Sequence, residues 1–519
     1  MNSVSAETGQ NIRFGPYRVN PGPPLYAALL AAYCLGRIWF TWGVELGKDE
    51  AAYWYWGQDL DASYALLPFA LFGLAHALAA GHEWVLRLPS ILAGAGAAIL
   101  LFRLCRLYSL SPGRSLAATA VFAASHWMWH ASSYLHPDAF LALCWLWALH
   151  QARLSLDAPR PATYISLGTA LGLCLLCKYS AAFLAAGLFL WLLVTTPPRR
   201  RIALLLQTAL PCALVALPLA WAQWRTDFYL PSTLSTLSRI VEEDPLPWRL
   251  ALFLLNPLTF VSPPLLWLLY RAGWRNGRRA AAAWRAAAPD SLLALLPALA
   301  LFAGFAFFAL SRGQIKGNWI LPGFLGLWPL ALAGLSRRAL LAVFAVGVLQ
   351  AWPIAYGLKY PGQAAALASD ALDATYVAMV SAPDRQREPS YSWSERLGEY
   401  HGWSGLAAAL EDSLRQSGIA AGVPLSSTQY GTVFAVNYYA GRPIYTVDDP
   451  RFRFLTSFEA LARPRPERTL FVVRQGTDAA SSLDAVYPHR RKLYTLERHP
   501  PKSPPVRYDL YLYSLRETQ

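Results

Sequence analysis

The sequence predicts an all-α, many-spanning membrane protein with a small soluble α/β domain at its C-terminal end. The chain of 519 residues is 55% hydrophobic and only 15% charged, whereas soluble domains carry about a quarter charged residues. Residues 25–357 consist of long apolar runs broken by short polar stretches, and residues 358–519 have an ordinary globular composition. All six cysteines lie in the apolar runs, which excludes a disulfide framework in the soluble domain.

The apolar part divides into about eleven spans, because a helix needs about 20 apolar residues to cross a bilayer. The first run is too long for a cleavable signal and is expected to stay as the first span, after a polar tail of residues 1–24. An outer loop is expected over 43–85, in which Asp59 to Ala80 suits a helix lying in the membrane interface. The spans are expected near 25–42, 86–104, 115–131, 136–152, 163–179, 180–196, 202–223, 249–270, 291–310, 318–335 and 339–357.

The distribution of charge predicts the orientation of the spans. With the N-terminus in the cytoplasm, loops on that side hold most of the arginines before position 358 and only three acids, Glu7, Asp157 and Asp290. An odd number of spans then places residues 358–519 outside the cytoplasm. The sequence pI near 9.5 arises from arginines scattered over short loops, so membrane lipids rather than nucleic acid are the expected partner.

The same alternation gathers polar side chains on the outer face. Ionisable residues at membrane depth are costly and are therefore functional hypotheses, although any one of them could be a structural ion pair or a snorkelling side chain. Glu83 and Arg87, spaced i, i+4, could pair with each other. The aromatic residues of the first loop could form an interfacial belt. The residues on this face are Asp49, Glu50, Tyr53, Trp56, Glu83, Arg87, His136, Asp138, Lys178, Arg312, Lys316, Asn318 and Trp319.

Acids beside cations under an apolar interface suit transfer from a lipid-borne phosphate to a hydroxyl group. A carboxylate that takes the hydroxyl proton typically contributes about 10²–10⁴ in rate. Lysine and arginine neutralise the charge that grows on the departing phosphate, each contact being worth about 3 kcal/mol. The lipid tail of the donor would keep the reacting group at the membrane surface.

Several motifs in chain order resemble the bacterial branch of the protein O-mannosyltransferase-like GT-C glycosyltransferases, a family that includes the aminoarabinose transferase of lipid A. Asp49 to Trp56 (D-E-A-A-Y-W-Y-W) is similar to its D-E-A-x-Y-W-x-W motif, and Glu83 to Pro89 to its E-x-x-x-R-x-P. His136 to Ala139 resembles its T-x-D-A-P segment. Gly172 to Ser180, with Lys178-Tyr179-Ser180, resembles its G-L-x-x-L-x-K-Y-[ST], and Lys316 to Pro322 its N-W-P-x-P.

The resemblance implies a GT-C fold and an inverting transfer of a sugar from a polyprenyl-phosphate donor. The acceptor would be a hydroxyl of lipid A or lipopolysaccharide, a glycolipid or a protein, at the outer face of a bacterial inner membrane, with the C-terminal domain periplasmic or extracellular. It assigns the general base to Asp49, with Glu50 supporting the acceptor or a metal. Lys178, Arg312 and Lys316 become the donor-phosphate contacts. The remaining residues become substrate contacts: Tyr53, Trp56, Glu83, Arg87, His136, Asp138, Asn318 and Trp319.

Two stretches depart from the family pattern. Tyr64-Ala-Leu66-Leu67-Pro68 stands where many relatives have Y-x-D-H-P-P, and Trp221-Ala-Gln223-Trp224 where they tend to have W-N before an outer loop. The missing His and acid leave the substrate open and weaken any metal assignment. No cofactor is expected to be required and no residue is assigned as a metal ligand, although the chemistry would accommodate a divalent metal.

Two other functions remain as alternatives. A transporter or lipid flippase usually places charges near the midplane and often has paired repeats, whereas these charges lie at one face and the halves show no repeat. An inactive assembly protein that has kept the fold is consistent with the missing second motif.

The C-terminal domain is expected to mix helices and strands. Helices are expected at 363–380 and Trp403–Ser417, and β-branched or aromatic runs at 432–439, 443–447, 469–473 and 506–515 are typical of strands. The domain has no catalytic constellation and suits a lid or a platform for the acceptor.

Overall fold

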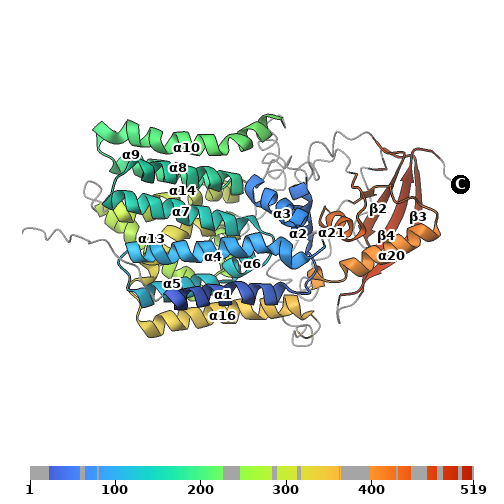
Figure 1. Cartoon of the computed structure of the whole chain (residues 1–519), viewed down its shortest axis with the longest axis horizontal. Helices are drawn as coiled ribbons and strands as arrows, with labels where there is room; N and C mark the ends of the chain where they lie inside the picture. The colour runs from blue at the N-terminus through green and yellow to red at the C-terminus, as the bar shows by residue number, and fades with distance from the viewer. Residues whose placement is uncertain are drawn as a thin grey trace, which may run out of the picture.

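A bundle of helices carries a small sheet-containing domain at one end, and the short helices α2 (Lys48–Gln58) and α3 (Leu66–Leu78) lie between the two (Figure 1). The computed structural model describes residues 23–58, 65–78, 81–225, 246–282, 289–312, 317–361, 363, 398–427, 430–445, 465–475, 483–484, 486–500 and 505–516. Two predicted segments lie largely outside this part of the chain. They are the expected tail 1–24, of which only the last two residues are described, and the expected helix 363–380, of which only Gln363 is described.

Eight long helices coincide with expected spans. They are α1 (Pro23–Thr41), α4 (Glu83–Leu107), α7 (Pro137–Asp157), α8 (Pro161–Cys177), α9 (Ala181–Thr195), α10 (Pro198–Arg225), α14 (Pro289–Arg312) and α16 (Arg337–Lys359). In the described residues, four of them (α4, α10, α14 and α16) are long and apolar enough to cross a membrane. Only 11% of the apolar window of α10 and 28% of that of α16 is buried in the protein, so their outer surfaces are suited to lipid rather than water.

Three expected spans are interrupted, which corrects the prediction of continuous helices there. Residues 115–131 form α5 (Pro112–Ala124) and α6 (His126–Ser133), and 249–270 form α12 (Leu246–Leu255), η1 (Asn256–Thr259) and the start of α13 (Pro263–Ala282). Residues 318–335 form η2 (Gly317–Trp319), η3 (Leu321–Gly326) and α15 (Trp328–Leu332). Prolines at 257, 263, 322 and 329 remove helix hydrogen bonds in two of these regions. In the third, the Ser125 side chain caps the new helix by accepting from the Met128 N–H at 3.4 Å.

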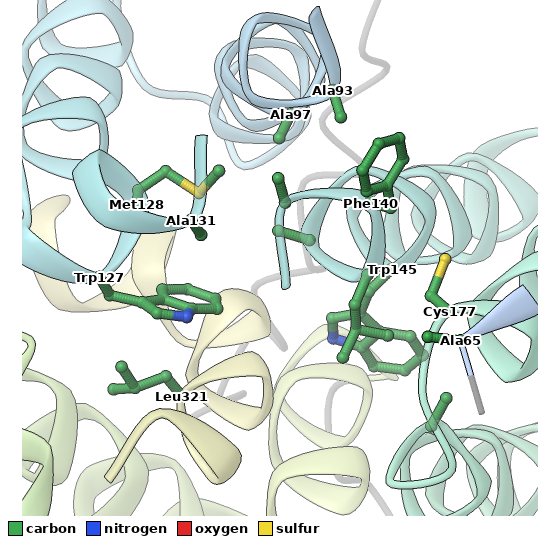
Figure 2. Close-up of a cluster of buried hydrophobic side chains, with 14 of the residues drawn as sticks. Ala65, Ala93, Ala97, Trp127, Met128, Ala131, Phe140, Trp145, Cys177 and Leu321 are labelled. Atoms are coloured by element: carbon green, nitrogen blue, oxygen red, sulfur yellow. The ribbon is translucent and has the colours of Figure 1, made fainter. Parts of the chain in front are cut away.

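Small residues allow the helices of the bundle to approach closely. A Cβ at Gly168 of α8 would lie 2.1 Å from the Thr208 carbonyl oxygen of α10, and one at Gly172 would lie 2.7 Å from that of Cys212. These two glycines form a G-x-x-x-G on the face of α8 that contacts α10, the arrangement that brings membrane helices together. Large side chains fill the rest of the interior, among them Trp127 of α6 and Trp145 of α7 (Figure 2).

The C-terminal domain is built on a sheet of four strands in the order β1-β2-β4-β3. Its strands are β1 (Leu425–Ser426), β2 (Arg468–Arg474), β3 (His489–Arg498) and β4 (Val506–Ser514). β1 runs parallel to β2, and the other two pairings are antiparallel. The strands expected at 469–473 and 506–515 and the helix expected at 403–417 (α20, Trp403–Gln416) are confirmed.

Two features of this domain were not foreseen. The run 432–439 is not a strand but the core of α21 (Tyr430–Ala440). Consecutive residues from Val433 to Val436 are all buried there, because α21 packs against both α2 and α20. Contact on several sides favours a helix that is apolar all round and overrides the strand preference of Val and Phe. β3 was missed because it is an edge strand with exposed Arg490, Arg491 and Lys492. Of 443–447, only a single bridge at Ile444 is described.

Candidate functional site

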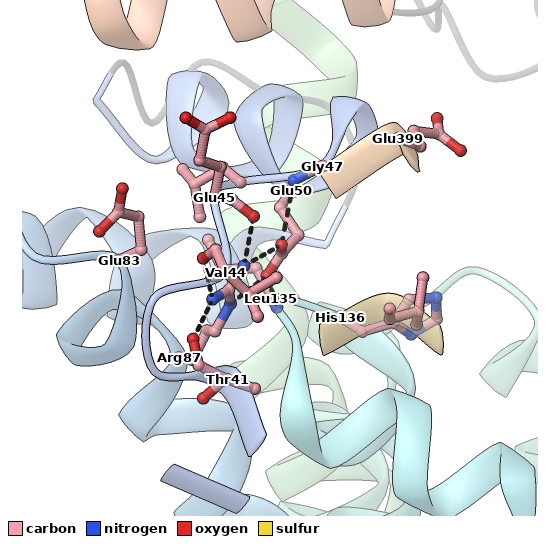
Figure 3. A network of polar contacts seen from close by, with 12 residues as sticks. Thr41, Val44, Glu45, Gly47, Glu50, Glu83, Arg87, Leu135, His136 and Glu399 are labelled. Carbon is pink, nitrogen blue, oxygen red and sulfur yellow. Dashed lines mark hydrogen bonds and ion pairs between the residues drawn. The ribbon is translucent and has the colours of Figure 1, made fainter. Parts of the chain in front are cut away.

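A buried ion pair lies where α1 leads into α2 (Lys48–Gln58). Glu50 is 2% exposed, and Arg87 of α4 is fully buried. The Nη2 and Nε groups of Arg87 donate to the two carboxylate oxygens of Glu50 at 2.6 and 2.9 Å. The backbone N–H groups of Gly47 and Leu135 donate to the same carboxylate at 3.2 and 2.8 Å (Figure 3). The Glu50 carboxylate is therefore enclosed by donors of the protein itself.

The rest of the Arg87 guanidinium holds the loop that follows α1. Nη1 donates to the carbonyls of Thr41 and Val44 at 3.0 and 2.8 Å, and Nη2 donates to that of Glu45 at 2.9 Å. With the two bonds to Glu50, these occupy the five N–H donors of an arginine. Arg87 does not take up the alternative pairing with Glu83 that their i, i+4 spacing left open, because its guanidinium bonds Glu50 across 37 positions of the chain. Glu83 instead accepts from the Tyr439 hydroxyl at 3.2 Å.

Asp49, the other acid of the motif, lies in a different environment. It is exposed, whereas Glu50 beside it is buried. Both residues belong to the first turn of α2, where successive side chains point about 100° apart because a helix has 3.6 residues per turn. Asp49 lies within electrostatic range of His130 and His136. The D-E pair thus divides into an accessible carboxylate and a structural one.

A second buried carboxylate, Asp138, accepts hydrogen bonds from side chains of several separate segments of the bundle. It is completely buried at the start of α7. Its Oδ1 accepts from the Lys178 ammonium at 2.7 Å, and its Oδ2 accepts from the Asn318 amide at 2.8 Å and the Trp127 indole at 3.2 Å. Lys178 is the cap residue at the end of α8 and is 7% exposed. An ammonium has three N–H donors, so the bond to Asp138 orients Lys178 and does not exhaust it.

His136 connects the two acidic centres. Its Nδ1 accepts from the Asp138 N–H at 3.1 Å, which caps α7. The ring of His136 is half-buried and meets the Tyr53 ring edge-on, with centroids 6.1 Å apart. Both Asp49 and Lys178 lie within its electrostatic range. Asp49, Tyr53 and Lys178 therefore lie around His136, at the end of the bundle that faces the C-terminal domain (Figure 1).

The C-terminal domain covers this region through α21. The ring centroids of Trp54 and Tyr438 are 4.8 Å apart, as are those of Tyr55 and Phe434. A Cβ at Gly431 would lie 2.5 Å from the Cβ of Lys48, so α21 needs a glycine where it meets the first turn of α2. The aromatic residues of the first loop thus bind the two domains together, which a membrane belt alone would not require.

Polar contacts fix the same junction. The Tyr439 hydroxyl accepts from the Leu46 N–H at 2.9 Å and donates to Glu83. Burial raises the pKa of Tyr439, and Glu45 and Glu83 raise it further, so this hydroxyl stays protonated as a donor. The Glu45 carboxylate accepts from the Trp403 N–H at 2.7 Å and the Ser404 N–H at 3.3 Å, and it thereby caps the first turn of α20 from outside the domain.

The remaining predicted residues fall into two groups. Trp56 is 7% exposed and packs between Phe69 and Phe434, and Trp319 packs on Phe305 with ring centroids 5.7 Å apart. Lys316 lies outside the described residues, and only the backbone of Arg312 is described, at the end of α14.

The residues of this site do not form a metal centre in the described part of the chain. No group of three or more His, Cys, Asp or Glu side chains is placed there to share a metal ion. Glu50, the residue expected to support a metal, has both oxygens engaged by Arg87 and by backbone N–H groups.

Sequence reasoning missed three residues that complete the site. His130 of α6 lies between His136 and Tyr134, with ring centroids 5.5 and 5.3 Å away. Tyr134 lies under the Arg87 guanidinium at 5.2 Å and against Tyr400 at 4.8 Å. A histidine near the outer end of an expected span was a usable signal for His130, whereas nothing local marks Tyr134 or Tyr400.

Comparisons with known proteins agree with this architecture. Residues 63–224 match the family model described as dolichyl-phosphate-mannose-protein mannosyltransferase. Two crystal structures of ArnT from Cupriavidus metallidurans, one in the apo state and one bound to undecaprenyl phosphate, superpose with TM-scores of 0.58 and 0.59. Each is 17% identical, and the match covers 96% of this chain and 99% of theirs. No curated protein sequence matches the chain. The chain therefore shares its fold with these two ArnT structures, and residues 63–224 are similar to that family of mannosyltransferases.

Proposed function

We propose that the protein transfers a sugar, with inversion, from a polyprenyl-phosphate donor to an acceptor hydroxyl. The observation that carries the proposal is the division of the D-E pair. Glu50 is enclosed by Arg87 and two backbone N–H groups, and exposed Asp49 is held beside it. The similar ArnT structure has undecaprenyl phosphate bound, which supports a lipid-linked donor of this class.

The reacting centre in this proposal lies over His136, between Asp49 and Lys178. The acceptor oxygen attacks the anomeric carbon while the bond from that carbon to the phosphate oxygen breaks. The hydroxyl proton passes to the Asp49 carboxylate, and the bonding electrons leave with polyprenyl phosphate. Lys178 stabilises the departing phosphate, with Arg312 and Lys316 as further cations. Tyr53, His136 and Asn318 are proposed to line the sugar site.

Glu50, Arg87, Trp56 and Asp138 act differently in this proposal. Since their polar groups or rings contact protein partners in the interior, they are positioning residues that shape the site without touching substrate. Glu83, through Tyr439, and Trp319, through Phe305, support the walls. No bound cofactor is assigned.

The proposed location is a bacterial inner membrane, with the N-terminus cytoplasmic and the C-terminal domain periplasmic or extracellular. The C-terminal domain then covers the site on the side from which a lipid, glycan or protein acceptor would approach. Docking of α21 on α2, which carries Asp49, supports a role for this domain in presenting the acceptor.

Turnover of the Asp49→Asn variant tests the proposal. Membranes containing the full chain are incubated with a labelled polyprenyl-phosphate sugar and envelope acceptors, and release of polyprenyl phosphate is followed. Loss of the base is expected to lower turnover about 10²–10⁴-fold. Asp412→Asn, the same chemical change at an exposed position of α20, should leave turnover unchanged. Equal turnover by wild type and Asp49→Asn would contradict the proposal.

A further inference from the structure

A cavity of about 610 Å³ lies at the end of the bundle away from the C-terminal domain. It is bounded by the connection between α7 and α8, the end of α9 and the beginning of α10, which meet at that end of the bundle (Figure 1). Its volume is within the range of about 300–1,000 Å³ typical of small-molecule sites. The residues proposed for glycosyl transfer lie at the opposite end, so this cavity serves a different purpose.

The charge of the cavity is positive. Arg199 and Arg200, both exposed, line it, and among the described residues no acidic side chain does. The nearby acid Asp157 is paired with Arg153 at 3.0 Å, and Arg153 also bonds Asp290 at 2.6 Å. The arginines of the cavity therefore face no carboxylate within its walls, and an anion is the complementary ligand.

The floor of the cavity and its surroundings are apolar. Tyr164 and Trp191 are almost completely buried beneath it. Exposed apolar side chains continue from it along the two helices that form its wall, with Ile202 at 73% and Leu206 at 51% exposed on α10 and Leu193 at 42% on α9. A soluble anion would make no use of these surfaces. A molecule with an anionic head and apolar chains matches both parts.

We propose that this cavity binds the headgroup of an anionic phospholipid, with Arg199 and Arg200 on the phosphate and the acyl chains along α9 and α10. The bound lipid would join the α7–α8 connection to the first turn of α10. It is a site distinct from that of the polyprenyl-phosphate donor, and it goes beyond the proposed function.

Lipid retention measured by native mass spectrometry tests this site without relying on turnover. The full chain in detergent is titrated with phosphatidylglycerol and, separately, with phosphatidylcholine of the same acyl chains. Wild type is expected to retain phosphatidylglycerol preferentially. The double variant Arg199→Ala/Arg200→Ala should bind it about 25-fold more weakly, because each arginine near an anionic headgroup contributes roughly fivefold.

A matched control separates a site from general surface charge. Arg337→Ala/Arg338→Ala removes two consecutive exposed arginines from the first turn of α16, outside the cavity, and should leave the preference intact. Thr195→Trp, which narrows the cavity without changing charge, should weaken retention as the first double variant does. Equal losses in both arginine pairs, no preference between the two lipids, or full competition by inorganic phosphate would overturn the proposal.

Discussion

At the scale of single residues, the main feature of the site is a pair of adjacent acids, one exposed and one buried in an ion pair. Asp49 and Glu50 differ in exposure although they share one helical turn. Arg87 determines this difference because its five donors bind Glu50 and three carbonyls of the preceding loop. The same contacts hold the first turn of α2, so removing Arg87 would also disturb Asp49.

Arg87→Met should lower the thermal unfolding midpoint strongly, because it leaves the Glu50 carboxylate buried without its cation. Breaking a buried pair in this way costs about 3–5 kcal/mol. Replacing both partners, as Glu50→Leu/Arg87→Met, should recover part of that loss. Unfolding followed by tryptophan fluorescence in detergent measures both. Arg338→Met, at an exposed arginine in the first turn of α16, should change stability by less than about 0.5 kcal/mol. A double variant no more stable than the single one would argue against a buried charge as the cause.

At the scale of elements, close packing of α8 against α10 positions Lys178. Gly168 and Gly172 let the two backbones meet, and Lys178 caps the end of the same α8 helix, where it reaches Asp138. The position of a candidate phosphate ligand thus depends on a glycine contact further along the helix.

Gly168→Ala should destabilise the bundle, since the new Cβ would lie 2.1 Å from a backbone oxygen of Thr208 and the helices would have to separate. Overpacking of this kind costs roughly 1–3 kcal/mol. Gly36→Ala in α1 is the control, because nothing lies within 4 Å of its added Cβ. That change should be neutral or stabilising. Thermal unfolding of the two variants in the same detergent makes the comparison, and similar midpoints would refute the packing argument.

At the scale of the whole molecule, docking of the C-terminal domain depends on a few polar contacts beside the aromatic ones. His401 is one of these contacts, since its Nε2–H donates to the Leu358 carbonyl at the end of α16 at 2.8 Å. Burial lowers the pKa of His401, against the opposing effects of the Leu358 bond and of Glu45, while Arg498 lowers it further. His401 is therefore neutral when the domain is docked.

Acidification should weaken this docking. A histidine whose pKa is lowered in the folded state contributes its full stability above its unfolded value of about 6.5, and loses it as pH falls through the folded pKa. Hydrogen-exchange protection factors at the junction, which are corrected for the slower intrinsic exchange at low pH, should therefore fall as the pH drops below about 6.5. His401→Gln keeps a donor but cannot titrate, so its exchange should change less over the same range. An identical pH response in the two proteins would place the titrating group elsewhere.

Much of the architecture followed from local properties of the sequence. Apolar length located the eight long helices, and runs of β-branched and aromatic residues located β2 and β4, because both depend on neighbouring residues alone. The interrupted spans and α21 could not be read in this way. Their prolines and aromatic residues are compatible with more than one structure, and contacts with α2 and α20 decided the outcome for α21.

For the site, the sequence by itself determined which chemical groups are present and that they fall near the ends of the apolar runs. Only the tertiary structure decided which of them meet. Arg87 bonds Glu50 across 37 positions rather than Glu83 across four, and Asp138 collects Lys178 and Asn318 across 40 and 180. Each buried carboxylate must find donors wherever the fold supplies them, because an unpaired charge in the interior is too costly to persist. The pattern of residues along the chain does not identify such distant partners. The difference between structural Glu50 and exposed Asp49 is therefore visible only in the packed structure.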